Sequence, residues 1–375
     1  GVARVMLRLA TAFASYGHRV DLVLCQVAGP YLHHLPASVN VVALKPSPGW
    51  LGRVSVLAAD PLGLGALLLP ILLPRKPPGT VRYIPDLAHY LQRQQPVVLL
   101  SAKPPANLAA LWARRLAQAT TRIVISERTH LSQELQGPHQ RKWRWRFIVP
   151  LLQRVYPWAD AIVSVSNGVA DDLAVQARLP RERITTIYNP TASIEKTDDP
   201  ALAAHAWFSP LAPPVILGMG RLVAQKDFST LLRAFAQVRA ERPVRLIILG
   251  EGRQRAELEA LVTRLGISED VWLPGFVDNP YAYLSRAALF ALSSAWEGLP
   301  NALIEALACG CPVVSTDCPS GPTEILDGGV YGPLVPVGDA AALAQAILSV
   351  LEAPPDPARL RTRAAAFSLN QAADR

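Results

Sequence analysis

Two glutamates, Glu297 and Glu305, lie in the segment SSAWEGLPNALIEAL at residues 293–307. The run Gly298-Leu299-Pro300 is typical of a loop, and most of residues 301–309 are good helix formers, so we predict a helix that begins after Pro300. Glu297 would then precede the helix, and Glu305 would lie about two turns inside it. The backbone N–H groups and the positive dipole at such a helix start suit a phosphate, with the two carboxylates beside it as acceptors for hydroxyl groups.

A pair of glutamates at this spacing is more often a pair of solvated charges. The neighbours of Glu305 argue against that interpretation, because residues 302–304 and 306–307 are all apolar. A carboxylate rarely lies in so apolar a helix without a partner.

Two cations follow the stretch 214–219, which has the composition of a strand. Arg221 comes directly after Gly218-Met219-Gly220, and Lys226 stands five residues further on. Cations at the carboxyl end of a strand are suited to a diphosphate, and Arg at such a turn can contact it through two N–H groups. The sequence has no G-x(4)-G-K-[ST] phosphate loop and no D-x-D pair for a divalent cation, so we expect no metal and no resident cofactor.

A second polar cluster, Glu127, Arg128 and His130, follows the strand-like stretch 122–126. Residues at the carboxyl ends of parallel strands face the crevice of an open α/β sheet, so these three side chains are candidates for contact with an acceptor substrate. A surface or capping histidine is the alternative interpretation of His130.

Strand-like and helix-like stretches alternate along most of the chain, which predicts α/β domains with parallel sheets covered by helices. Strands are expected at 19–26, 39–44, 96–101, 122–126, 161–166, 184–188, 214–219, 244–249, 271–273, 288–292 and 312–316. Helices are expected at 2–16, 105–119, 167–178, 228–241, 253–265, 281–286 and 301–309.

The length of 375 residues, half of them hydrophobic, favours two domains. We predict a first domain at 1–190, a proline-rich linker at 191–213, a second domain at 214–354, and the start of a further helix at 355–375. Because the sequence begins inside a helix, we expect the first strand of the first domain to be missing. The four cysteines are too few for a disulfide framework, which favours a reduced cytosol, and Cys309, Cys311 and Cys318 are better explained as buried thiols than as a metal site.

Charge is divided unevenly along the chain. Residues 1–190 hold 22 Lys and Arg against 9 Asp and Glu, whereas residues 191–375 hold 15 against 20. A basic first half is suited to an anionic surface, either lipid or nucleic acid.

Two stretches bear on that choice. Residues 54–73 are strongly apolar but interrupted, and are either a poorly packed core helix with loops or a membrane-interface contact that does not cross the bilayer. Residues 139–158 interleave basic and aromatic side chains, which suits a membrane interface, a nucleic acid, or a solvated helix with one packed face. With no nucleic-acid fold signature elsewhere, we favour an anionic membrane surface and expect no nucleic-acid partner.

The segments GMGRLVAQKD, LGEG, LPGFVDNP and SSAWEGLPNALIEALACGCPVV, in this order, resemble the retaining glycosyltransferase family 4, whose members have the two-domain GT-B fold. The segments ASYGHRVDLVL and VSNGVADDL are similar to the first domain of that family. The end of the chain, RTRAAAFSLNQAADR, is similar to the start of the family's last helix, which crosses back onto the first domain. The resemblance implies two Rossmann-like domains that face each other across a cleft, and a chain truncated at both ends.

The resemblance also implies roles for individual residues. Arg221 and Lys226 would bind the diphosphate of the donor, Glu297 the sugar hydroxyls, and Glu305 the ribose; we expect Arg221, Lys226 and Glu297 to be the catalytic residues. The other donor-binding residues would be Gly220, Gly275, Phe276, Val277, Gly298, Leu299, Pro300 and Asn301. One departure is Thr323, which stands in GPTEIL where relatives commonly have Arg.

The family implies transfer with retention, in which the leaving phosphate helps to deprotonate the acceptor and no protein nucleophile is required. SERTH, WEGLPN and CPSGPTEIL look closest to bacterial members that build polysaccharide or glycan on a lipid carrier. We therefore expect a metal-independent hexosyltransferase that uses a UDP-hexose or UDP-N-acetylhexosamine and acts as a peripheral protein at the cytoplasmic face of the membrane. The alternatives are a catalytically inactive membrane-surface binding module of this fold and a nucleotide-sugar epimerase, although no catalytic acids for an epimerase stand out in the first domain.

Overall fold

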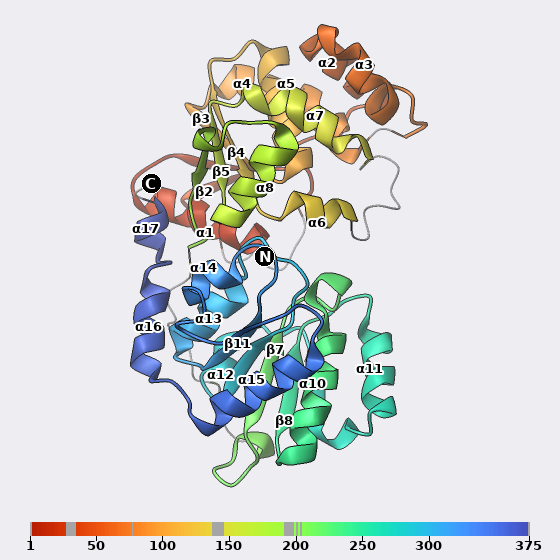
Figure 1. The fold of residues 1–375 in the computed structure, drawn as a ribbon. Coiled ribbons are helices and arrows are strands. Elements are labelled where there is room, and N and C mark those ends of the chain that lie inside the picture. Colours follow the sequence, from red (N-terminus) through yellow and green to blue (C-terminus); the bar gives the residue numbers. More distant parts are fainter. Residues whose placement is uncertain are drawn as a thin grey trace. The chain divides into compact units, whose positions relative to one another are not determined.

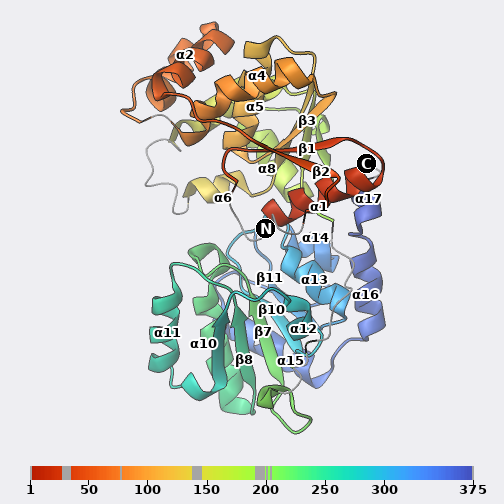
Figure 2. The same ribbon diagram turned by 180° about the vertical axis from the view of Figure 1, so that it is seen from behind.

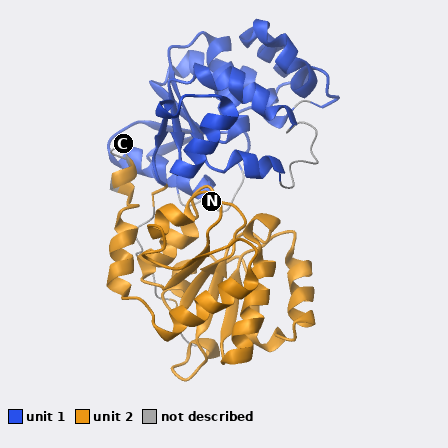
Figure 3. Cartoon of the chain, in the orientation of Figure 1, with its two compact units in different colours: residues 1–188, 375 blue, residues 189–374 orange. Residues whose placement is uncertain are grey.

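The computed structural model describes residues 2–27, 35–76, 78–136, 146–190, 199, 202 and 205–373. It divides into two compact units, residues 1–188 and residues 189–374 (Figure 3). The division falls after Tyr188, two residues before the predicted end of the first domain, and places the predicted linker and the C-terminal segment in unit 2.

Unit 1 contains two parallel sheets (Figure 1). Its strands are β1 Val20–Leu24, β2 Val39–Ala43, β3 Val98–Ala102, β4 Arg122–Glu127, β5 Ala161–Ser164 and β6 Ile184–Thr186. Strands β1 and β2 pair with each other, and the remaining four pair in the order β3-β4-β5-β6. All six lie within a few residues of the predicted strands.

The helices of unit 1 include the predicted ones and several that were not predicted. They are α1 Val2–Ser15, α2 Gly49–Ala59, α3 Leu64–Leu67, α4 Ile84–Gln94, α5 Pro104–Ala117, α6 Leu131–Gln136, α7 Ile148–Val155 and α8 Asn167–Ala177, with short turns η2 Pro61–Gly63, η3 Leu68–Leu72, η4 Gly79–Tyr83, η6 Tyr156–Trp158 and η7 Arg181–Arg183. Helix α5 packs on β3 and β4, and α8 packs on β4, β5 and β6. Helix α2 lies in an outer layer, against α4 and α5.

Unit 2 contains one parallel sheet of six strands in the order β12-β11-β10-β7-β8-β9. Its strands are β7 Val215–Met219, β8 Arg245–Leu249, β9 Val271–Gly275, β10 Leu289–Leu292, β11 Val313–Thr316 and β12 Leu334–Val335. From the first strand, β7, the chain builds outward through β8 and β9, then returns to the other side of β7 with β10. This is the strand order of a doubly wound Rossmann sheet, as the alternating pattern predicts.

Helices cover both faces of this sheet (Figures 1 and 2). The helices and turns of unit 2 are η8 Ala206–Phe208, η9 Ala224–Lys226, α10 Phe228–Glu241, α11 Arg255–Arg264, η10 Ser268–Asp270, α12 Pro280–Leu284, α13 Asn301–Cys309, α14 Pro322–Leu326, α15 Ala340–Glu352, α16 Pro357–Ala365 and α17 Leu369–Ala373. Helices α10, α11 and α15 share one apolar core with the strands, and α13 packs on β10 and β11. Asp227 and Asp339 cap α10 and α15, each accepting a hydrogen bond from a backbone N–H of the first turn.

Two expectations need correction. Glu305 lies four residues after the start of α13, which is about one helical turn and not two, although the helix begins at Asn301 as predicted. The segment 355–373 contains two helices, α16 and α17, where the start of one was expected. Residues 54–73 are helical but interrupted, since α2 ends at Ala59 and the chain bends into η2, α3 and η3.

The basic and aromatic stretch 139–158 falls partly outside the described residues, which resume at residue 146. Three side chains of its described part are buried in unit 1 or contact other residues of that unit. Tyr156 is fully buried, Arg154 pairs with Asp60, and Trp158 lies under the Arg115 guanidinium at 4.1 Å. These three side chains thus have partners within unit 1, and the membrane interpretation of the stretch stays a prediction.

No single helix among the described residues is long and apolar enough to cross a bilayer; the helical stretches 49–59 and 61–72 satisfy length and composition only as a pair, and they are bent by 102°.

Candidate functional site

The predicted site residues of unit 2 meet where the strand order of its sheet reverses. Strands β7 and β10 are neighbours in the sheet but not in sequence, and the chain leaves their carboxyl ends in opposite directions along the sheet. In open α/β sheets, ligands commonly bind at the carboxyl ends of strands related in this way. Arg221 and Lys226 follow β7, and Glu297 follows β10. The topology alone therefore brings the two cations and the carboxylate to one edge of the sheet.

Lys226 and Glu297 form an ion pair through Nζ and Oε1. The same carboxylate oxygen accepts a hydrogen bond of 2.6 Å from the hydroxyl group of Ser294. Glu297 is 6% exposed, while 16% of the Lys226 side chain is exposed. A buried carboxylate is tolerated here because a cation and a hydroxyl group replace the water that it has lost.

Backbone contacts hold the two loops together around this pair. Ser293 donates through Oγ to the carbonyl of Lys226 at 2.9 Å, and Thr316 donates to the carbonyl of Ser294 at 2.7 Å. The N–H of Glu297 donates to the carbonyl of Pro319 at 3.2 Å. The loop after β10 is thus fixed to the loops after both of its neighbouring strands.

Close backbone packing fixes the loop that carries the cations. Gly250 has φ +136°, and a Cβ on it would lie 1.9 Å from the carbonyl oxygen of Gly220. The N–H of Gly250 donates to the carbonyl of Gly275 at 2.8 Å, and the N–H of Gly220 donates to Leu249 at 2.9 Å. Only glycine permits this approach, which brings Gly220 and Gly275, both predicted donor-site residues, to either side of position 250.

Glu305 is buried in α13, at 4% exposure, and the Tyr281 hydroxyl group of α12 donates to it at 3.3 Å. At the start of the same helix, Asn301 accepts a hydrogen bond of 2.9 Å from the side chain of Asn189. The preceding residue is Pro300, whose side chain cannot cap the helix. The carboxylate predicted to hold a ribose is thus present near the site, with a neutral partner.

The other predicted donor-site residues differ in exposure. Arg221 is exposed, and Phe276 is 51% exposed beside the half-buried Val277, so these side chains can meet a ligand directly. Gly298, Leu299 and Pro300 are buried and contribute backbone. Thr323 donates through its hydroxyl group to Asp317.

In unit 1, Glu127 is a buried residue at the end of β4, with 2% exposure. Its Oε1 accepts hydrogen bonds from the hydroxyl group of Tyr156 and, at 2.8 Å, from the amide of Asn107. Burial raises the pKa of Glu127 to about 7, although the hydrogen bonds from Tyr156 and Asn107 act in the opposite direction. The hydrogen-bond partners Tyr156 and Asn107 lie inside the unit, and contact of Glu127 with an acceptor stays a prediction.

The other two acceptor-side candidates lie nearer the surface. Arg128 donates to Met6 Sδ at 3.2 Å, and burial lowers its pKa to about 10 while the charge of Glu127 acts against that shift. His130 Nδ1 lies 3.4 Å from Asp172 Oδ2, and Ser132 also contacts that carboxylate. The Asp172 carboxylate therefore orients His130.

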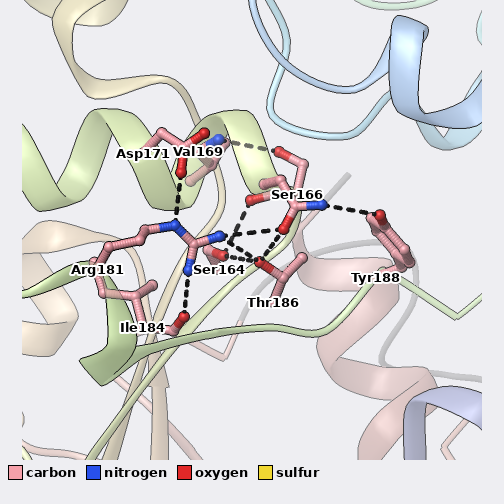
Figure 4. A network of polar contacts seen from close by, with 9 residues as sticks. Ser164, Ser166, Val169, Asp171, Arg181, Ile184, Thr186 and Tyr188 are labelled. Atoms are coloured by element: carbon pink, nitrogen blue, oxygen red, sulfur yellow. Dashed lines mark hydrogen bonds and ion pairs between the residues drawn. The ribbon is translucent and has the colours of Figure 1, made fainter. Parts of the chain in front are cut away.

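A second polar network links the ends of β5 and β6, with Arg181 at its centre (Figure 4). Arg181 donates to Asp171 at 2.6 Å, to the carbonyl of Ile184 at 2.7 Å and to Asn167 at 3.2 Å. Asn167 also accepts from Thr186 at 2.9 Å. Ser166 caps α8 by accepting from the N–H of Val169, so the SNG segment is fixed at both its helix and its strand side.

Sequence reasoning missed several residues of these clusters. Ser294 and Tyr281 are the hydrogen-bond partners of the two predicted carboxylates, and Asn107 and Tyr156 are those of Glu127. Ser294 could have been suspected from its place three residues before Glu297. The other three come from distant segments, and no local signal identifies them.

Of the three cysteines near the site, Cys311 and Cys318 are buried and Cys309 is partly exposed. Burial raises the pKa of Cys309 and of Cys318 to about 12, and that of Cys311 further. Among the residues that the structure describes, no group of three or more His, Cys, Asp and Glu side chains could hold a metal ion.

Both units match known family models. Residues 1–192 match the model described as Glycosyltransferase Family 4, and residues 213–353 match the one described as Glycosyl transferases group 1.

Two curated relatives are similar over part of their length. The N-acetylgalactosamine-N,N'-diacetylbacillosaminyl-diphospho-undecaprenol 4-alpha-N-acetylgalactosaminyltransferase of Campylobacter jejuni is 36% identical over 246 residues, which cover 66% of this chain and 64% of that protein. The lipopolysaccharide core biosynthesis glycosyltransferase LpsE of Rhizobium meliloti is 33% identical over 192 residues, which cover 51% of this chain and 54% of LpsE. The chain thus spans less than two thirds of the length of either relative.

Solved structures share the fold. HepE of Anabaena, in complex with UDP and glucose, matches with a TM-score of 0.77 at 20% sequence identity. The match covers all of this chain and 94% of the HepE chain. The lipopolysaccharide outer core galactosyltransferase WaaB has a TM-score of 0.69 at 18% identity, covered to 93%, also with all of this chain matched. These likenesses confirm two Rossmann-like domains of the GT-B class.

Proposed function

Because this chain belongs to glycosyltransferase family 4, we propose that it moves a sugar from a nucleotide diphosphate to a lipid-linked or polysaccharide acceptor. The observation that carries the proposal is the Lys226–Glu297 pair at the carboxyl ends of β7 and β10, with Arg221 in the same loop as Lys226. A sheet edge with two cations and one carboxylate suits a donor that has a diphosphate at one end and sugar hydroxyl groups at the other.

In the proposed reaction, the bond between the anomeric carbon and the donor phosphate oxygen breaks, and its electron pair stays on the diphosphate. Arg221 and Lys226 stabilise the negative charge that develops there, which is the largest contribution expected of this site. The acceptor oxygen bonds to the anomeric carbon on the same face, and its proton passes to the leaving phosphate. No protein nucleophile and no metal enter this scheme.

Glu297 has two tasks in this proposal. Its carboxylate accepts hydrogen bonds from the sugar hydroxyl groups, and it holds Lys226 in place through the observed ion pair. Ser294 keeps the carboxylate oriented. Glu305, one turn further into α13, would hold the ribose of the nucleotide, and the backbone at Gly275, Phe276 and Val277 would face the base.

The donor and acceptor follow from named similarities. HepE was solved with UDP-glucose, and the Campylobacter relative is named as an N-acetylgalactosaminyltransferase that acts on a diphospho-undecaprenol substrate. We propose a UDP-hexose or UDP-N-acetylhexosamine as donor, and an acceptor at the cytoplasmic face of the membrane, where the chain acts as a peripheral protein. On the acceptor side we retain Arg128 and His130, and we assign Glu127 to the interior of unit 1.

The first experiment is a thermal-shift screen of UDP-, GDP- and ADP-sugars, followed by a transfer assay with the donor that raises the unfolding midpoint. We expect one UDP-sugar to stand out, an axial anomeric bond to be retained in the product by NMR, and turnover to persist in EDTA. Donor binding without any release of UDP would instead identify a binding module. A change of the donor sugar without an acceptor would identify an epimerase.

A further inference from the structure

Residues 49–73 of unit 1 present large apolar side chains to solvent. We call the following set the apolar patch: Trp50 at 64% exposure, Val54 at 54%, Leu62 at 91%, Leu64 at 50%, Leu68 at 41%, Leu69 at 42% and Leu73 at 62%. Single exposed apolar residues are ordinary, but seven within 24 residues mark an interaction surface.

In helix α2, the exposed side chains lie on the face that does not pack against the rest of unit 1. Val56 and Ala59 are buried against the unit, whereas Trp50 and Val54, four residues apart, lie on the opposite face. On the inner face, a Cβ on Gly52 would lie 2.6 Å from the carbonyl oxygen of Val81, so η4 and α2 touch through backbone. With its inner face occupied in this way, α2 cannot turn Trp50 inward.

An ion pair between a buried carboxylate and a partly exposed arginine lies at the bend after α2. Asp60 is 2% exposed, and the Arg154 guanidinium of α7 donates to both of its oxygens, at 2.6 Å from Nε and 2.5 Å from Nη2. Such a bidentate pair fixes direction as well as distance. Leu62 and Leu64 directly follow this anchor, so the 102° bend presents them on a fixed support.

The charges around the apolar patch have one sign. Residues 46–85 contain four cations, Arg53, Arg75, Lys76 and Arg82, and a single carboxylate, Asp60. Asp60 is the residue buried in the ion pair with Arg154, while Arg75, Lys76 and Arg82 are exposed. An exposed apolar surface with exposed cations and no exposed carboxylate in the same segment is complementary to an anionic lipid surface.

We propose that the apolar patch is a bilayer-docking surface, which inserts shallowly among the headgroups and upper acyl chains of anionic lipids. Fluid acyl chains can cover leucine side chains that are scattered over a surface, because they need no complementary shape. The lipid phosphate groups pair with Arg75 and Lys76. The packed inner face of α2 keeps the segment in the interface plane, so it does not span the membrane. The inference deepens the proposed function, on which it rests, by assigning the surface that brings the enzyme to a lipid-linked acceptor.

The test is co-sedimentation of the full chain with phosphatidylcholine vesicles that contain either no or one-fifth phosphatidylglycerol, at low and high salt. The decisive variant combines Trp50→Ser, Leu62→Ser and Leu73→Ser. We expect its partition coefficient on anionic vesicles to fall at least tenfold, with an unchanged unfolding midpoint because all three side chains are exposed.

The matched control removes three apolar side chains elsewhere that are also more than half exposed, through Val97→Ser, Val175→Ser and Leu211→Ser, at 82%, 73% and 98% exposure. This control should bind vesicles as the wild type does. A charge variant, Arg75→Ser with Lys76→Ser, should bind about tenfold more weakly at low salt and equally at high salt, because salt screens the contribution that it lacks.

Three results would overturn the proposal. The first is no binding of the wild type to anionic vesicles, and the second is an equal loss of binding in the decisive variant and the control. The third is self-association of the wild type in sedimentation velocity that the decisive variant abolishes, which would assign the patch to a second copy of the chain.

Transfer to a detergent-dispersed acceptor separates this inference from the proposed function. The decisive variant should retain that transfer, whereas an error in the proposed function would abolish transfer in the wild type and leave vesicle binding intact.

Discussion

Two buried glutamates at the carboxyl ends of parallel strands, Glu127 in unit 1 and Glu297 in unit 2, have different partners. Glu127 is 2% exposed and receives hydrogen bonds from two neutral groups, Tyr156 and Asn107. Glu297 is 6% exposed and is paired with a cation, Lys226, whose side chain still reaches solvent.

The difference shows that burial at a strand end does not by itself identify a ligand site. Neutral partners cannot fully replace water around a carboxylate, and the pKa of Glu127 is correspondingly raised to about 7. A partly exposed lysine can exchange part of its pairing for an anionic ligand. We therefore propose that Glu297 belongs to a ligand site and that Glu127 stabilises unit 1. The first three experiments below test that distinction, and the fourth tests a polar network outside both clusters.

The largest effect is expected from Glu297→Gln, which keeps the shape of the side chain and removes its charge. Transfer should fall by two to three orders of magnitude, about 3–4 kcal/mol of transition-state stabilisation, because Lys226 loses its counter-ion and the sugar its acceptor. Initial-rate kinetics with the selected UDP-sugar measure this. The control Glu259→Gln removes a 51% exposed carboxylate of α11 and should leave turnover unchanged; full activity of Glu297→Gln would remove Glu297 from the mechanism.

Glu127→Gln should act on stability in a pH-dependent way. The folded state keeps the Glu127 proton up to about pH 7, whereas an unfolded chain loses it near the ordinary pKa of 4.5. This group's stabilising contribution is therefore complete below pH 4.5 and is lost as the pH rises to 7, a loss of about 3 kcal/mol. Urea unfolding at pH 4.5 and pH 8 should show the Glu127→Gln variant gaining that amount relative to the wild type. A difference between variant and wild type that does not change with pH would mean that Glu127 is ionised in the folded protein.

Donor binding should separate the two clusters directly. A UDP-sugar at 100 times its Kd should stabilise the wild type by about 2.7 kcal/mol. At that donor concentration the stabilisation should fall below about 1 kcal/mol in Lys226→Ala and persist in Glu127→Gln, as followed by the unfolding midpoint. Equal loss in both variants would mean that the two clusters are not distinct in function.

The smallest effect is expected from Arg181→Ala, in the half-exposed network of β5 and β6. Four hydrogen bonds are lost, but 36% of the Arg181 side chain is exposed and water replaces part of them, so we expect a loss of about 1 kcal/mol in the free energy of unfolding. Asp171→Ala, which removes a 68% exposed partner of Arg181, should cost less than about 0.5 kcal/mol. Equal losses in the two variants would show that the contacts to Ile184 and Asn167 contribute nothing.

The sequence predicted those features that depend on local pattern. The alternation of strands and helices indicated the Rossmann sheet of unit 2, and α10 and α13 begin and end at the predicted residues. The placement of Glu297, Arg221 and Lys226 after β10 and β7 could be predicted because it depends only on the local strand pattern.

Features that depend on contacts between distant segments could not be predicted. The hydrogen-bond partners of Glu127 come from α5 and η6, so the sequence around Glu127 does not indicate them. The stretch 54–73 was ambiguous for the same reason. Asp60 at its bend pairs with an arginine 94 residues away, and no local pattern indicates that contact.

The close approach at Gly250 also limits how this site can change. With its Cβ position 1.9 Å from the Gly220 carbonyl, even alanine would push the loop after β7 away from the strand beside it and displace Lys226. Random mutagenesis aimed at new sugar-nucleotide specificity should therefore leave position 250 untouched. Phe276 is the better position to vary in a library of variants, because its side chain is 51% exposed and a substitution there does not force two backbone segments apart.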